Sequence, residues 1–106
     1  MRILSRSMVP VSVLAGALII GGCGSQPQIG PDREAFKSVD ALYTAISLRD
    51  PGLLDRCAAR LGELAASGKL PEPAHRSLGE IIAEARSGRW EPSQEQLARF
   101  MEAQRR

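Results

Sequence analysis

Apolar residues recur at helical spacing through most of the chain after residue 31. They follow one another every three or four positions in four successive segments, which places them on one face of each helix. Alternation with a period of two is missing and β-branched residues are sparse, so the pattern predicts an all-α domain. The predicted apolar stripes are Phe36, Val39, Leu42, Tyr43 and Ile46; Leu53, Leu54, Cys57, Ala58, Leu61, Leu64 and Ala65; Ala74, Leu78, Ile81, Ile82 and Ala85; and Leu97, Phe100 and Met101.

Local signals predict where these helices begin and end. The first helix is expected from Asp32 to Arg49, and Asp50-Pro51 to begin the second, since aspartate caps a helix and proline suits its first position. Residues 70–73 (LPEP) predict a stiff connector before the third helix. Glycines end helices by adopting left-handed backbone, and Pro92 is expected to open the fourth helix. The predicted glycine stops are Gly68 and Gly88.

Short connections between the predicted helices favour antiparallel neighbours. A shift of 39 positions also lays Val39 on Leu78 and Leu61 on Phe100, as in two stacked helical hairpins. The predicted fold is therefore a small bundle of four short helices, arranged as two antiparallel hairpins. Because any two amphipathic helices can be aligned, the match does not by itself establish an internal duplication.

The first residues have the pattern of an export signal. Arg2 and Arg6 precede an apolar stretch over residues 8–20, shorter than the ~20 residues that span a bilayer. The tetrapeptide that follows, Ile20-Gly21-Gly22-Cys23, resembles the lipobox of bacterial lipoproteins, although Gly21 stands where that family more often has Ala, Ser or Thr. The resemblance implies cleavage between Gly22 and Cys23, and a lipid on Cys23. A signal cut elsewhere and an uncleaved anchor are the alternatives.

This interpretation divides the chain into three parts. Residues 1–22 would be the lipoprotein signal peptide, residues 23–31 the lipidated cysteine with a flexible tether rich in Gly, Ser, Gln and Pro, and residues 32–106 the helical domain. The expected location is the bacterial cell envelope, with the protein held on a membrane by acyl chains. Gly24 leaves no aspartate after the cysteine, which favours the periplasmic face of an outer membrane where two membranes exist.

The charge of the chain depends on the signal. The complete chain has a net charge of +2, but residues 23–106 hold equal numbers of acidic and basic side chains. The composition therefore gives no reason to expect a nucleic-acid partner. Cys23 and Cys57 are the only cysteines, so Cys57 would be the only free thiol if Cys23 carries a lipid. It is predicted to be a small buried side chain, or to pair with Cys23 if that residue carries no lipid.

Few residues point to catalysis. His75 is the only histidine and belongs to no catalytic motif, so we expect an exposed or capping side chain. Neither a metal-ligand spacing nor a glycine-rich phosphate loop occurs in the sequence. We therefore expect no enzyme, no cofactor and no metal, with a carrier or an enzyme that uses His75 as the less favoured alternative.

Recognition of another protein is the remaining hypothesis. Trp90 is a candidate anchor for a partner, or a side chain that packs over the end of the core. The neighbouring arginines are a candidate cluster for an acidic partner. Residues 77–104, with Gly88-Arg89-Trp90-Glu91 at the turn, resemble a tetratricopeptide-like hairpin, but Ile81 and Phe100 stand where that repeat has small residues. An envelope protein is the expected partner of an interaction or assembly-accessory module; a structural protein that contacts the cell wall through Arg105 and Arg106 is the alternative. The candidate partner-binding residues are Trp90, Arg86, Arg89 and Arg99.

Overall fold

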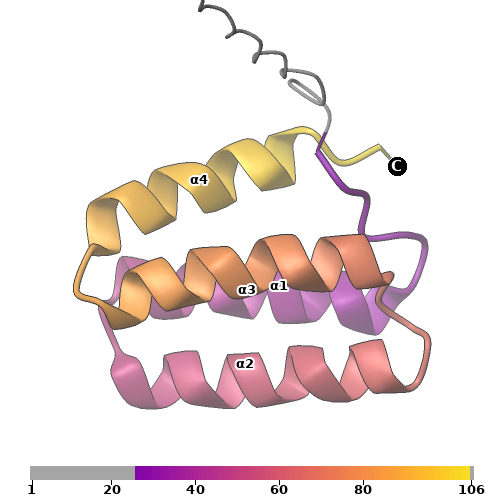
Figure 1. The fold of residues 1–106 in the computed structure, drawn as a ribbon, viewed down its shortest axis with the longest axis horizontal. Helices are drawn as coiled ribbons and strands as arrows, with labels where there is room; N and C mark the ends of the chain where they lie inside the picture. Colours follow the sequence, from indigo (N-terminus) through magenta and orange to yellow (C-terminus); the bar gives the residue numbers. More distant parts are fainter. Residues whose placement is uncertain (1–25, 106) are drawn as a thin grey trace, which may run out of the picture.

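The computed structural model describes residues 26–105, and the signal and lipobox residues lie outside them. Within this range the chain forms four helices, α1 (Arg33–Ser47), α2 (Pro51–Ala66), α3 (Glu72–Arg86) and α4 (Trp90–Glu102). Each helix contacts its neighbours in the order α1, α2, α3, α4 and back to α1. The helices run alternately up and down, so that α1 and α2 form one hairpin and α3 and α4 the other (Figure 1). The predicted all-α bundle of two antiparallel hairpins is confirmed.

The first hairpin begins each helix with an aspartate. The Asp32 carboxylate accepts a hydrogen bond from the backbone N–H of Ala35 at 3.1 Å, and the Asp50 carboxylate accepts one from Leu53 at 3.1 Å. Asp50-Pro51 thus starts α2 as predicted. Asp32 is the cap of α1 and precedes the helix, which ends at Ser47, two residues before the expected end.

Both helices of the second hairpin begin earlier than expected. α3 starts at Glu72 within the expected connector, and α4 starts at Trp90 instead of Pro92. Pro73 and Pro92 lie in the first turns of these helices, where the backbone N–H has no partner inside the helix. A proline therefore marks the beginning of a helix only to within one turn.

Three connections use left-handed backbone. Gly68 and Gly88 have φ angles of +81° and +90°, as predicted for glycines that follow helix ends. The turn between α1 and α2 places Arg49 in the same region, with φ at +54°. This conformation is unfavourable for a residue with a Cβ atom, so Arg49 adds backbone strain to its turn.

One hydrophobic core fills the space between the hairpins. Side chains from all four helices are buried in it, and Phe36, Tyr43, Trp90 and Met101 pack partly buried against it. The predicted stripes therefore face the core. Its largest fully buried side chains include Leu42, Ile46, Leu54, Leu61, Leu78, Leu97 and Phe100.

The two hairpins follow the same register. Adding 39 to the bounds of α1 gives the bounds of α3, and adding 39 to the first residue of α2 gives the first residue of α4. The left-handed residues of the two turns, Arg49 and Gly88, are separated by the same interval. Pairs of buried residues also match, among them Val39 with Leu78 and Leu61 with Phe100. The hairpins are structurally equivalent.

Glycines inside two helices have no packing role. A Cβ atom added at Gly62 or Gly79 would meet nothing within 4 Å, so neither marks a close approach of helices. Both positions are open to alanine, which favours a helix over glycine by about 1 kcal/mol.

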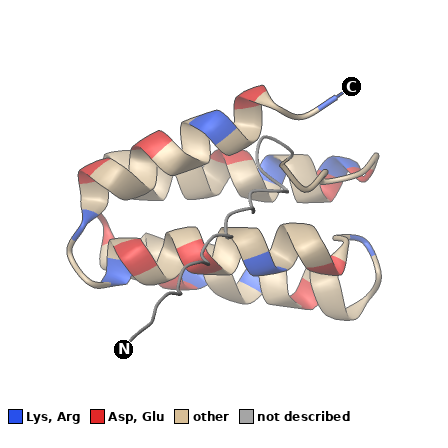
Figure 2. Ribbon diagram, turned by 45° about the horizontal axis from the view of Figure 1, so that its top comes forward, with Lys and Arg blue, Asp and Glu red and all other residues tan. Residues whose placement is uncertain are grey.

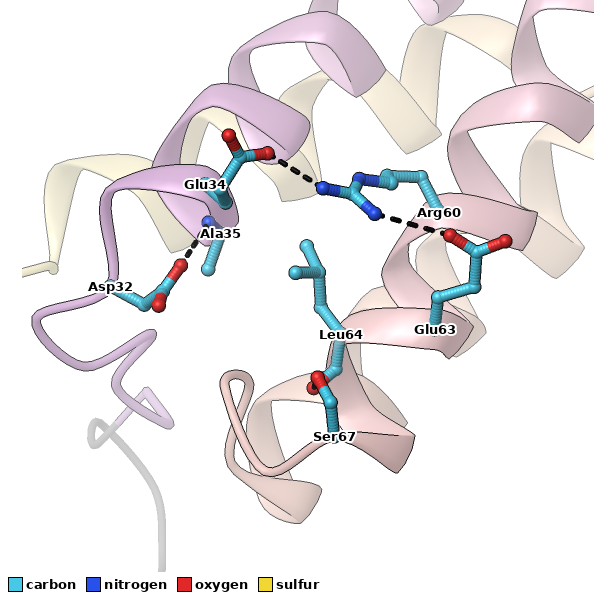
Figure 3. A network of polar contacts seen from close by, with 7 residues as sticks. All are labelled: Asp32, Glu34, Ala35, Arg60, Glu63, Leu64 and Ser67. Carbon is cyan, nitrogen blue, oxygen red and sulfur yellow. Dashed lines mark hydrogen bonds and ion pairs between the residues drawn. The ribbon is translucent and has the colours of Figure 1, made fainter.

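An exposed ion-pair network joins the beginning of α1 to the end of α2 (Figure 3). Arg60 donates to Glu34 at 2.7 Å and to Glu63 at 3.1 Å. The hydrogen bond from Arg60 and its positive charge hold the pKa of Glu34 below the usual value. Acidic and basic residues alternate over all four helices, so none of the drawn elements carries a charge of only one sign (Figure 2).

Candidate functional site at the two ends of the bundle

The two ends of the described chain, residues 26–31 and residues 103–105, lie together at one end of the bundle (Figure 1). Residues 26–31, called the strap, cross the end of α4 before the chain enters α1. Gln104 binds the strap through both of its amide atoms: Nε2 donates to the Pro27 carbonyl at 3.0 Å, and Oε1 accepts from the Ile29 N–H at 2.7 Å. Gln28 reciprocates, since its Nε2 donates to the Ala103 carbonyl at 3.1 Å. Its Oε1 accepts from the Arg105 N–H at 2.9 Å.

These four hydrogen bonds, called the clasp, correct the expectation of a flexible tether for residues 26–31, the described part of that segment. The described part of that segment is packed on the bundle, and Ile29 is only 1% exposed. Ile29 lies beside Val39 of α1 and Met101 of α4. It is the only aliphatic residue in residues 24–31, and this is the one signal in the sequence from which packing of the segment could have been predicted.

The opposite end of the bundle carries the α1–α2 and α3–α4 turns. Leu48 lies there with 66% of its surface exposed, and it is the only large hydrophobic residue so exposed among the described residues. Trp90, at the start of α4, packs partly against the core. Nearby, the Gln94 amide donates to the Tyr43 hydroxyl oxygen at 3.2 Å and joins α4 to α1. This end, called the turn end, therefore carries an exposed leucine in one turn and a partly buried tryptophan at the other.

The candidate arginines do not form one cluster around Trp90. Arg86 pairs with Asp55 of α2 at 2.9 Å, and Arg89 pairs with Glu84 of α3 at 2.8 Å. Arg99 lies nine residues after Trp90, about 13 Å along α4. It lines a polar hollow of about 290 Å³. Sequence reasoning grouped these arginines by their proximity in the chain, whereas their carboxylate partners lie on different helices.

The α3–α4 turn is locked by one buried hydrogen bond. The Ser93 hydroxyl donates to the Ile81 carbonyl at 2.9 Å, and the serine is fully buried. This bond fixes the first turn of α4 against α3. Trp90 is therefore held on a rigid element.

Cys57 is free and 6% exposed, as predicted for a small buried side chain. Burial raises the pKa of its thiol, because the low-polarity surroundings disfavour the thiolate. The thiol is therefore poorly suited to nucleophilic chemistry in the folded protein. The lipidation and cleavage residues, Cys23 and Gly22, lie outside the described residues.

His75 occupies the first turn of α3, at the strap end. Its Nδ1 atom lies 4.0 Å from Glu72, and its side chain is 37% exposed. Among residues 26–105, no group of three or more His, Cys, Asp or Glu is placed to hold a metal ion. No helix in the same range is long and apolar enough to cross a bilayer.

Comparison with known proteins yields no relative. No family model, curated protein or solved structure matches this chain. The resemblances to a lipobox and to a tetratricopeptide-like hairpin therefore rest on the residues quoted above.

Proposed function

We propose that this protein is a small lipid-anchored lipoprotein of the bacterial envelope that binds another envelope protein through the turn end. The observation that carries the proposal is the position of the strap. It leads the chain into the bundle at the end opposite Leu48 and Trp90. An anchor on Cys23 would therefore attach the bundle to the membrane through the strap end, with Leu48 and Trp90 at the opposite end of the bundle.

The chemistry of the turn end supports recognition of a protein. Tryptophan is one of the residue types that most often serve as anchors in protein interfaces. Within residues 26–105 Leu48 stays largely exposed, and the strained Arg49 follows directly. Strained backbone is retained most often where a function requires the conformation.

The anchor is tested first. Mass spectrometry of the mature protein from bacterial cells is expected to show Cys23 as the first residue, carrying a diacylglycerol group. The Cys23→Ala variant should leave the membrane fraction. An unmodified cysteine or an uncleaved signal would overturn the anchor.

The binding surface is tested in intact cells with a photocrosslinking residue at position 48. We expect one discrete crosslinked protein, which is lost on replacement of Trp90 by Ala while the helical circular dichroism remains. The matched control is position 69 in the α2–α3 connection, at the strap end. Equal crosslinking from both positions would contradict a binding surface at the turn end.

A further inference from the structure

A groove of about 700 Å³ opens beside the strap. One wall is the strap itself, the other is the outer face of α1, and the C-terminal residues close one end. The clasp forms this groove, because without its hydrogen bonds the strap wall would not be fixed. The residues that line it are Gln28, Gly30, Pro31, Arg33, Phe36, Asp40 and Arg105.

The groove combines an apolar floor with two cations. Phe36 and Pro31 are its apolar lining residues, whereas Arg33 and Arg105 are its cations. Within residues 26–105 neither arginine takes part in an ion pair, in contrast to Arg60, which is held by two carboxylates. Asp40 also lines the groove and leaves it with an excess of one positive charge.

This combination fits the headgroup region of a phospholipid. Guanidinium groups bind phosphate oxygens in a bidentate manner, and aromatic rings are favoured where headgroups meet acyl chains. The attraction is larger for lipids with a net negative charge, since a zwitterionic headgroup carries its own cation.

The position of the groove agrees with this ligand, on the basis of the proposed anchor. Only Gly24 and Ser25 separate Cys23 from the first strap residue, so that the connecting chain spans at most about 10 Å. This reach is comparable to the Debye length of about 8 Å at physiological salt. The strap end would therefore remain within the electrostatic field of the membrane surface.

We propose that this groove binds the phosphate of an anionic phospholipid in the membrane that carries the anchor. Arg33 and Arg105 bind the phosphate, and Phe36 packs against the glycerol and the first methylenes. The contact fixes the orientation of the bundle, so that the turn end points away from the bilayer. The lipid anchor alone fixes only the distance between the bundle and the bilayer.

The experiment uses the acylated mature protein in vesicles, with a tryptophan as reporter. Trp90 is replaced by Phe, and Phe36→Trp places the only tryptophan in the groove. Vesicles contain either phosphatidylglycerol or phosphatidylcholine, with a nitroxide quencher near the headgroup. We expect at least twofold stronger quenching with phosphatidylglycerol. Pro31→Trp serves as a second reporter if the Phe36 variant loses helical circular dichroism.

Two sets of variants test the cations. Combined replacement of Arg33 and Arg105 by Gln is expected to reduce the quenching to the phosphatidylcholine level. Arg49→Gln is the matched control, because Arg49 is exposed at the turn end and forms no ion pair within the described residues. Equal quenching in both lipids, or quenching unaffected by the double replacement, would overturn the groove as a headgroup site.

Free phosphate is the other source of the same chemistry. Glycerol phosphate added in large excess over the lipid is expected to leave the quenching difference between the two lipids unchanged. If glycerol phosphate abolishes that difference, the groove binds a soluble phosphate compound instead. A failure of the proposed anchor can be distinguished from a failure of the groove, because a missing anchor shows in the mass of the mature protein as an unmodified Cys23. A chain without acylation, mixed with the same vesicles, would still show the lipid preference of the groove.

Discussion

The two hairpins share one register of helix starts and turns, but different interactions stabilise each of them. Equivalent helices start 39 residues apart, yet the first hairpin uses aspartate caps at both of its helices. At the second hairpin, the residues before α3 and α4 are Pro71 and Arg89, and neither makes a side-chain capping bond. The second hairpin depends instead on the buried Ser93 bond and on the clasp with the strap. A common backbone register is thus compatible with different local interactions.

The equivalent arginines show the same contrast. Arg60 and Arg99 lie 39 residues apart and occupy equivalent positions. Glu34, a partner of Arg60, corresponds to Pro73 in the second hairpin. Arg99 consequently has no ion pair in the part of the chain that is described, and Arg60 has two. At this position the first hairpin pairs its arginine, whereas the second leaves Arg99 beside the polar hollow.

The largest expected effect tests whether the hairpins share one core. Phe100→Ala should lower the free energy of unfolding by about 3–5 kcal/mol, and Leu61→Ala by about 2–5 kcal/mol, since both side chains are fully buried. Urea unfolding is followed by Trp90 fluorescence for the second hairpin and by Cys57 labelling for the first. Coincident transitions are expected; separate transitions would show two independent units.

The next comparison replaces the left-handed residue of each turn. Gly88→Ala should destabilise the protein by about 1–2 kcal/mol, because a Cβ atom is unfavourable at its φ of +90°. Arg49→Gly should stabilise it by up to about 1 kcal/mol, as the strain at φ +54° is relieved. Thermal unfolding measures both. Destabilisation by Arg49→Gly would mean that the arginine side chain stabilises its turn.

A smaller difference is expected at the helix caps. Asp50→Ala removes the capping bond of α2 and should cost about 1 kcal/mol. Arg89→Ala at the equivalent position removes only an exposed ion pair, so that a loss below about 0.5 kcal/mol is expected. Chemical denaturation distinguishes the two. Similar losses would contradict the assignment of capping to the first hairpin alone.

The smallest effect concerns pH. Arg60 lowers the folded-state pKa of Glu34, so that their interaction stabilises the fold fully above the ordinary pKa of 4.5. This contribution is lost as the pH falls through the lowered folded value. Glu34→Gln should therefore reduce the decline of the melting temperature below pH 4.5, whereas Glu102→Gln should not. An equal change in both variants would exclude a specific role for the pair.

Local patterns in the sequence predicted most of the fold. Helical periodicity, the Asp50-Pro51 cap and the glycines at 68 and 88 report interactions between residues close in the chain, and these predictions are confirmed. The prolines predicted the starts of α3 and α4 less well, because proline is tolerated at several positions of a first turn.

The candidate site was less predictable. The groove and the clasp depend on contacts between residues about 75 positions apart, which local patterns do not encode. Composition indicated a flexible segment, and only Ile29 departed from it. The arginines near Trp90 were grouped by sequence distance, although Arg86 pairs with Asp55 of α2 and Arg89 with Glu84 of α3, while Arg99 lines a separate hollow.

The clasp also sets an order of events during synthesis. Its hydrogen bonds join residues 27–29 to residues 103–105, so they cannot all form until residue 105 has emerged from the ribosome. The helices α1, α2 and α3 are therefore synthesised before the strap can be fixed on the bundle.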